Sequence, residues 1–174
     1  MGGVCSGYSV PKKVLLMGPK GSGKTTLLYG WCLPGQETMA APTQSFNVEM
    51  VYGVRNGQML LMWDISDISR RRQFYHGTEA LVYLLDASEL SNLQEVQADL
   101  RVLLRDRDMK GLPLLFVLSK ADLNNMYSIP SIEKELDLEN IAADRKYDWA
   151  TIRQDEPTTF QVALQKLCSL VYSK

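Results

Sequence analysis

The sequence predicts an α/β fold, in which helices cover both faces of a six-stranded, mostly parallel sheet with one antiparallel hairpin strand. Three observations predict it. Short apolar segments alternate with segments of helical spacing along the chain. Residues 18–26 read Gly-Pro-Lys-Gly-Ser-Gly-Lys-Thr-Thr between the first apolar segment and the first helical one, and Asn56-Gly57 separates two strand-like segments. At 174 residues the chain is long enough for one domain with a substantial core.

The glycine-rich stretch at 18–26 is the strongest indication of function. It matches G-x-x-x-x-G-K-[ST], the loop that binds phosphate groups. Consecutive N–H groups of such a loop can face one anion, and the positive end of the following helix favours negative charge there. Lys24 is expected to bind the β- and γ-phosphates, and the Thr25 hydroxyl to bind Mg²⁺. The predicted phosphate-binding residues are Gly18, Lys20, Gly21, Ser22, Gly23, Lys24, Thr25 and Thr26.

Polarity patterns predict the remaining elements. Strands are expected at 13–17, 46–54, 59–64, 81–85, 112–118 and 147–150, and helices at 25–31, from a capping box at 91–94 onward, at 131–136 and at 159–172. Asp86, which follows a buried strand, is expected to start a turn or cap a helix, with a role beside Mg²⁺ as the alternative. Ligands of such sheets bind beyond the carboxyl ends of the strands, so functional residues should lie in the loops that follow strands.

Composition excludes several classes of protein. A net charge of −1 gives no electrostatic reason to expect nucleic-acid binding. The three cysteines are too scattered for a disulfide framework or a zinc site, so reduced thiols in the cytoplasm are expected. No apolar run reaches the roughly 18 residues of a membrane-spanning helix.

The first residues carry a lipidation pattern. Met1-Gly-Gly-Val-Cys-Ser6 fits M-G-x-x-x-[ST], with Gly2 as the myristoylation site, and Cys5 is placed to take a second acyl chain. One myristoyl group binds a membrane only marginally, so stable anchoring needs the second chain. An unmodified start is the alternative. We expect residues 1–12 to form a flexible segment ahead of a single domain at 13–174.

Four further segments resemble motifs of one protein family. Residues 41–49, Ala-Pro-Thr-Gln-Ser-Phe-Asn-Val-Glu, are similar to the switch I pattern P-T-x-G-F-N-V-E, and Trp63-Asp64 looks like the start of the W-D-x-G-G-Q switch II. Ser119-Lys-Ala-Asp122 is similar to the guanine-reading N-K-x-D, and Trp149-Ala150-Thr151 occupies the place of the last base-contacting loop. The chain thus resembles, over nearly its whole length, the small GTPases of the ADP-ribosylation factor and Arf-like family.

The resemblance implies a phosphate-loop small-GTPase fold that binds GTP or GDP with Mg²⁺. Lys24 and Thr43 would serve catalysis. The implied metal ligands are Thr25, Thr43 and Asp64, and the implied guanine contacts are Ser119, Lys120, Asp122 and the backbone of Ala150. Asp122 would accept from the donors of the guanine ring, and mismatched donors and acceptors are what make such discrimination large.

The resemblance also implies partners. Members of the family bind effectors through an aromatic patch, and Phe46 and Trp63 fall on matching positions. Either Phe74 or Tyr75 could supply the third ring, and Tyr75 is our prediction. We therefore expect a monomer that binds effector and regulator proteins and acts in membrane trafficking at a membrane surface reached through Gly2.

Switch II departs from the family pattern. Where the family has D-x-x-G-Q, this chain has Asp64-Ile-Ser-Asp67-Ile68, and isoleucine has no polar atom with which to orient a water molecule. A carboxylate at 67 facing the γ-phosphate at about 4 Å would be repelled by about 4 kcal/mol at an effective dielectric of 20. The segment is also about four residues shorter than the family's, roughly one helical turn. Impaired hydrolysis is therefore expected.

Other functions stay open on these residues. A pseudo-GTPase that binds GDP or no nucleotide and acts as an interaction module is favoured by Asp67, Ile68 and Ser119. A phosphate-loop kinase is disfavoured by the guanine-reading motif and by the hairpin. The run at 70–72, Arg-Arg-Arg, is predicted to be a solvated basic face, with contact to an acidic partner or to lipid headgroups as the alternative.

Overall fold

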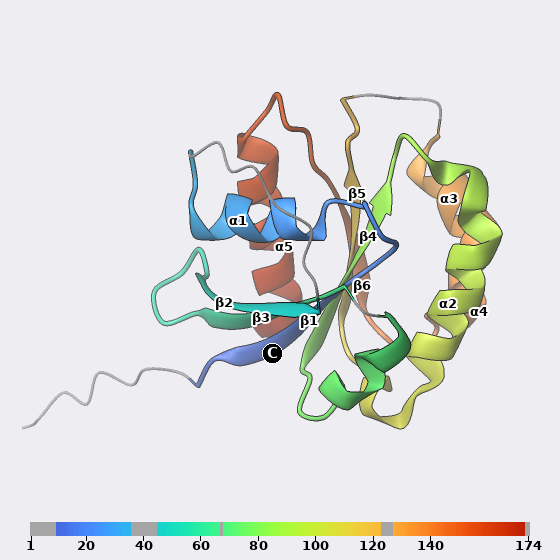
Figure 1. Cartoon of the computed structure of the whole chain (residues 1–174), viewed down its shortest axis with the longest axis horizontal. Helices are drawn as coiled ribbons and strands as arrows, with labels where there is room; N and C mark the ends of the chain where they lie inside the picture. The colour runs from blue at the N-terminus through green and yellow to red at the C-terminus, as the bar shows by residue number, and fades with distance from the viewer. Residues whose placement is uncertain (1–9, 36–44, 67, 123–126, 173–174) are drawn as a thin grey trace, which may run out of the picture.

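The sheet has six strands in the order β2-β3-β1-β4-β5-β6, as Figure 1 shows. The computed structural model describes residues 10–35, 45–66, 68–122 and 127–172. The strands are β1 (Lys12–Met17), β2 (Phe46–Tyr52), β3 (Met59–Ile65), β4 (Ala80–Asp86), β5 (Leu114–Ser119) and β6 (Tyr147–Thr151). Among these six strands, β2 and β3 pair antiparallel, and the other four pairings are parallel. The predicted fold class is confirmed.

Helices lie on both faces of this sheet (Figure 1). They are α1 (Lys24–Cys32), α2 (Leu93–Arg105), α3 (Ile129–Leu136), α4 (Leu138–Ile141) and α5 (Thr158–Tyr172). Three 3₁₀ segments, η1 (Ile68–Phe74), η2 (Leu90–Asn92) and η3 (Arg107–Met109), complete the described elements. Helices α1 and α5 cover one face, and α2, α3 and α4 cover the other.

The apolar strands are continuous because both of their faces are buried. In β1, Leu15 and Met17 pack with α2 and α3, whereas Val14 and Leu16 pack with α1 and α5. All four side chains are at most 2% exposed. Alternate residues of a strand point to opposite faces, so a strand between two helical layers has no solvated side to carry polar residues.

Local structure confirms the predicted hairpin turn and corrects the predicted start of one helix. The hairpin turns at residues 55–58, where the Gln58 N–H donates to the Arg55 carbonyl, and Gly57 adopts a φ of 84° as predicted for an Asn-Gly turn. The predicted capping box is wrong. Ser91 lies inside η2, and α2 begins at Leu93 behind Asn92, whose side chain makes no capping hydrogen bond.

The proposed lipidation sites, Gly2 and Cys5, lie outside the described residues. Among the described helices, none is long and apolar enough to cross a membrane.

Candidate nucleotide-binding site

The phosphate loop joins the end of β1 to the start of α1, and its backbone requires glycine. Gly18 has a φ of 138°, and a Cβ there would lie 2.4 Å from the Leu84 carbonyl oxygen of the neighbouring strand. Gly23, the residue before α1, has a φ of 89°. Residues that have a side chain rarely adopt such φ angles. The two glycines therefore allow the loop to fold tightly against β4 and to lead into α1.

Lys24, the first residue of α1, points back into this loop. Its Nζ donates to the carbonyl oxygens of Gly18 and Pro19, both at 2.9 Å, and the residue is only 7% exposed. Burial lowers the pKa of Lys24, and the nearby Asp64 carboxylate opposes that effect. A buried cation held by loop carbonyls fits a site built for an anion, because phosphate oxygens would stabilise its charged form.

Thr25 and Asp64 meet at the predicted metal position. The Thr25 hydroxyl donates to Asp64 Oδ2 at 2.6 Å, and Asp64 is fully buried near the end of β3. A hydroxyl and a carboxylate beside phosphate oxygens are the donor set that Mg²⁺ favours, since this ion takes few protein ligands and keeps phosphates and water. The two residues therefore fit a Mg²⁺ ion bound with nucleotide. Thr43, the third predicted ligand, lies outside the described residues.

Ser119 ties the base-binding side of the site to the phosphate loop. It ends β5, is 1% exposed, and its Oγ lies 2.7 Å from the Ser22 carbonyl oxygen and 3.1 Å from that of Leu85. A Cβ on Gly23 would stand 3.8 Å from the Ser119 side chain, an ordinary van der Waals contact, so glycine at 23 is required by its φ of 89° and not by the space beside Ser119. Serine thus provides a connection between the two halves of the site.

Lys120 is anchored by an aspartate at the end of β4. Its Nζ pairs with Asp86 Oδ2 at 2.5 Å, and the Ser88 N–H donates to Asp86 Oδ1 at 2.9 Å. Burial acts to raise the pKa of Asp86, but the Lys120 ammonium and the two Ser88 donors outweigh it, so that pKa is lowered. Asp86 starts the turn as predicted, and the sequence did not indicate its ion pair.

Asp122 carries an acceptor without a partner. Its Oδ1 is buried and makes no hydrogen bond to any described residue. Buried polar atoms form hydrogen bonds in the great majority of cases, so a buried carboxylate oxygen without a partner is expected to accept a hydrogen bond from a ligand. Adjacent N–H groups on the edge of a guanine ring would provide one.

Ala150 does not lie in a base-contacting loop, and that prediction is wrong. It lies within β6, pairs with Val117 of β5 and is 4% exposed in the core. The sheet contact continues to Ile152, whose N–H donates to the Leu118 carbonyl at 2.9 Å. The loop beyond the strand therefore begins at Arg153. The apolar Ile152 after Thr151 was the signal that the strand runs further than predicted.

Three aromatic rings form a cluster on β2, β3 and η1. Phe46, Trp63 and Phe74 have centroids 5.1 to 5.8 Å apart, and Phe46 is 48% exposed. The third ring is Phe74, so the prediction of Tyr75 is wrong: Tyr75 is 3% exposed in the core. Neighbouring side chains at the end of a 3₁₀ turn point about 120° apart, so the two cannot share one face.

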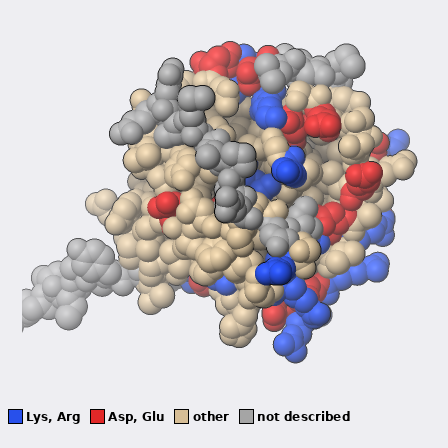
Figure 2. All heavy atoms as spheres, in the orientation of Figure 1, with Lys and Arg blue, Asp and Glu red and all other residues tan. Residues whose placement is uncertain are grey.

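The predicted solvated basic face is correct for Arg70 and Arg72, which are exposed, and wrong for Arg71, which is buried; the Arg72 side chain is 81% exposed. Arg71 is 8% exposed and pairs with Asp99 at 2.5 Å, and Arg72 pairs with Asp106 at 3.0 Å. Figure 2 shows basic and acidic side chains interleaved along that edge of the molecule. Lys13 of β1 also holds the end of this segment, because its Nζ donates to the carbonyl oxygens of Phe74 and His76 at 2.6 and 2.8 Å. Asp67 and the side chain of Ile68 lie outside the described residues.

Comparison with known proteins agrees with this arrangement. The model of the ADP-ribosylation factor family matches residues 5–170. ADP-ribosylation factor K of Dictyostelium discoideum is 32% identical over 139 residues, which cover 78% of this chain and 72% of that one. ADP-ribosylation factor-like protein 3 of Chlamydomonas reinhardtii is 33% identical over 134 residues, covering 74% and 73%.

A solved structure has the same fold. The Arl6 BBS3 small GTPase from Trypanosoma brucei, solved with the nucleotide analogue GppNp, superposes with a TM-score of 0.76 at 22% identity, covering 93% of this chain and 99% of that one. The family match, the relatives and the fold agree with the phosphate loop and the orphan carboxylate described above. The chain belongs to the ADP-ribosylation factor family of GTP-binding proteins.

Proposed function

We propose that this chain is a guanine-nucleotide switch or scaffold that holds GTP or GDP with Mg²⁺ at a membrane surface and hydrolyses GTP slowly. The main support is that Lys24 lies in the phosphate loop, Thr25 contacts Asp64, and Asp122 follows β5, whose last residue Ser119 contacts that loop, whereas isoleucine stands where the family has its water-orienting glutamine. The phosphate-binding part of the site is thus present, and the water-orienting side chain is not.

Each described residue has a definable task. Lys24 would place its charge on the β- and γ-phosphates, and Asp122 would accept from the guanine ring. Mg²⁺, when bound through Thr25 and Asp64, neutralises charge on the phosphate oxygens. Hydrolysis is an in-line attack of water on the γ-phosphate, and Ile68 has no polar atom to orient that water. The expected reaction is therefore slow unless a partner protein supplies an arginine, a group worth about 10³ to 10⁵ in rate.

Nucleotide titration tests the binding half of the proposal. Labelled GTP, GDP and ATP are titrated with and without Mg²⁺, with Lys24→Ala as the deficient variant and Lys110→Ala, at an exposed position after η3 and outside the site, as its control. We expect guanine nucleotides to bind, Mg²⁺ to strengthen GTP binding, and Lys24→Ala to weaken both. Preference for ATP would overturn the guanine assignment. No binding at all would favour the interaction module.

Single-turnover hydrolysis tests the catalytic half. We expect a slow rate in the natural chain and a faster one in Ile68→Gln, because the glutamine restores a water-orienting group. Equal rates in the two proteins would show that residue 68 does not limit the reaction.

Membrane association is proposed on the pattern at Gly2. We expect the full chain, coexpressed with an N-myristoyltransferase, to gain the mass of one myristoyl group and to sediment with vesicles, and Gly2→Ala to do neither. An unmodified mass for the natural chain would contradict this part of the proposal.

A further inference from the structure

Exposed basic side chains gather on one edge of the molecule. Residues 70–72 and 105–110 include six basic side chains and two acidic ones, although the whole chain has a net charge of −1. The rest of the chain is therefore net acidic. Figure 2 shows basic side chains outermost along the lower right of the molecule, with acidic ones between them. The basic residues of these two segments that are exposed are Arg70, Arg72, Arg105, Arg107 and Lys110.

An ion pair joins the two segments that carry these charges. Arg72 Nε in η1 lies 3.0 Å from Oδ2 of Asp106, the residue after α2, and the Arg72 side chain is 81% exposed whereas that of Asp106 is 12% exposed. In η3 the Arg107 side chain is 88% exposed and that of its partner Asp108 is 32% exposed. The arginines thus lie outside the carboxylates that accompany them, so a ligand that approaches this edge meets positive charge first.

The start of β1 is fixed beside this basic edge. Lys13 donates from its Nζ to the carbonyl oxygens of Phe74, the last residue of η1, and of His76. Lys12 pairs with Glu79 at 2.6 Å, in the segment that leads from η1 to β4. The chain therefore enters the domain next to η1.

A lipid on Gly2 would be tethered close to this edge. Val10 lies eight residues after Gly2, and a chain of that length reaches at most about 29 Å when fully extended. One myristoyl group binds a membrane only marginally, and a cluster of basic residues is one of the second signals that make anchoring stable. Each lysine or arginine close to an anionic membrane strengthens binding about fivefold.

We propose that the basic edge formed by η1, the end of α2 and η3 binds the anionic headgroups of a membrane, and that it is the second signal that stabilises anchoring through Gly2. The lipidation pattern favours a membrane over an acidic protein as the ligand, because a lipid on Gly2 brings headgroups to this edge. A second acyl chain on Cys5 is then not required. This inference rests on the proposed membrane association.

Sedimentation of the full chain with vesicles tests the proposal. The chain is produced with an N-myristoyltransferase in a host that attaches no second acyl chain, and it is mixed with neutral vesicles or with vesicles that contain phosphatidylserine. We expect the edge variant, which carries Arg105→Gln and Lys110→Gln, to bind the anionic vesicles about 25-fold more weakly than the natural chain and the neutral vesicles equally well. High salt should remove the difference, because it screens the charges.

The matched control carries Arg55→Gln and Lys134→Gln. It changes the net charge by the same amount, at exposed positions in the hairpin turn and on α3. We expect it to bind anionic vesicles nearly as tightly as the natural chain. Circular dichroism checks that each variant is folded, and Arg105→Gln alone, with an expected loss of about fivefold, gives the same decision should the edge variant not fold.

The outcomes separate this inference from the proposed function. If the natural chain carries no myristoyl group or sediments with neither kind of vesicle, the proposed membrane association is overturned, and the inference with it. If the natural chain binds neutral and anionic vesicles equally, or if the edge variant binds anionic vesicles as tightly as the control, membrane association stands and the basic edge is overturned as its second signal. An acidic protein would then be the better candidate for the ligand of this edge.

Discussion

Asp99 connects η1 to the core, and its removal should be costly. Its Oδ1 pairs with Arg71 at 2.5 Å, and its Oδ2 accepts from the Tyr83 hydroxyl at 2.9 Å. Asp99→Ala would strand a guanidinium whose side chain is 9% exposed and a hydroxyl on a residue that is 1% exposed. Breaking a buried pair costs about 3 to 5 kcal/mol.

How exposed the Arg71–Asp99 pair is to water decides how much stability the substitution should cost within this range. The Asp99 side chain is 26% exposed, so water can reach Arg71 once the carboxylate is gone. We therefore expect a loss of about 3 kcal/mol in the free energy of unfolding, which includes about 1 kcal/mol for the hydrogen bond to Tyr83. In a chain of this size, such a loss lowers Tm by about 6 to 12 °C.

The assay is urea unfolding of three proteins followed by circular dichroism. Arg101→Ala is the matched control, because it breaks a pair from the same helix whose side chains are 37% and 32% exposed. An exposed pair of this kind contributes about 0 to 1 kcal/mol. If Asp99→Ala loses no more than Arg101→Ala, η1 is not fixed to α2 through Arg71.

Three further predictions concern the site. Gly18→Ala should lose about 2 kcal/mol or more in urea unfolding, because its Cβ would stand 2.4 Å from the Leu84 oxygen, whereas Gly21→Ala, with nothing within 4 Å, should lose only about 1 kcal/mol from backbone strain. Ser119→Ala should raise the Kd for GDP about fivefold because the hydrogen bond to Ser22 is lost, and Ser119→Asn should bind GDP at least as tightly as the natural chain; equal affinities in all three would contradict the tether. Because the folded pKa of Asp86 is lowered from 3.8, its ion pair stabilises the fold fully above about pH 3.8 and loses that effect as pH falls through the folded value. The difference in unfolding free energy between the natural chain and Asp86→Asn should thus be constant from about pH 5 to 7 and shrink below about pH 3.8, and a difference that persists at lower pH would contradict the assignment.

Several parts of the site follow from the sequence because they depend on neighbours along the chain. The phosphate loop between Met17 and Lys24 needs glycines at defined spacing, since only glycine fits the φ values and the close approach to Leu84. The buried strands and the Asn56-Gly57 turn follow from polarity and local backbone preference in the same way. Their prediction needed no knowledge of distant contacts.

Other parts were decided by packing between distant segments. The pairing of Arg71 with Asp99 joins η1 to α2, and nothing near Arg71 in the sequence indicates that acidic partner. The choice of Phe74 over Tyr75 in the aromatic cluster depends on the rotation of a 3₁₀ turn, which polarity alone does not set. Local sequence patterns predict neither, because both depend on which distant segments pack against each other in the folded chain.

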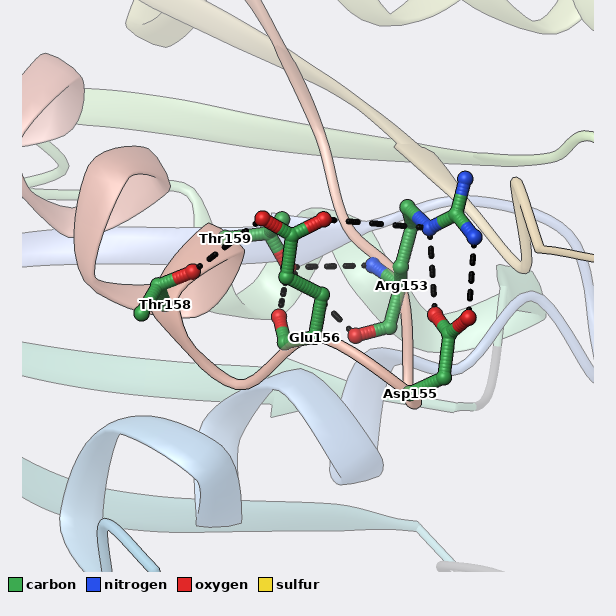
Figure 3. Close-up of polar contacts among 5 residues, drawn as sticks. All are labelled: Arg153, Asp155, Glu156, Thr158 and Thr159. Atoms are coloured by element: carbon green, nitrogen blue, oxygen red, sulfur yellow. Dashed lines mark hydrogen bonds and ion pairs between the residues drawn. The ribbon is translucent and has the colours of Figure 1, made fainter.

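The phosphate loop and the end of β6 show the same difference between what the sequence predicts and what packing decides. The sequence by itself determined the phosphate loop, because a tight turn before a helix is a property of contiguous residues. Only the tertiary structure decided where β6 ends, because the end of that strand is set by its pairing with β5, through Ala150 opposite Val117 and the Ile152 N–H on the Leu118 carbonyl. Ala150 is therefore a buried strand position, and the loop beyond the sheet begins three residues later at Arg153, whose N–H donates to Thr159 Oγ1 (Figure 3).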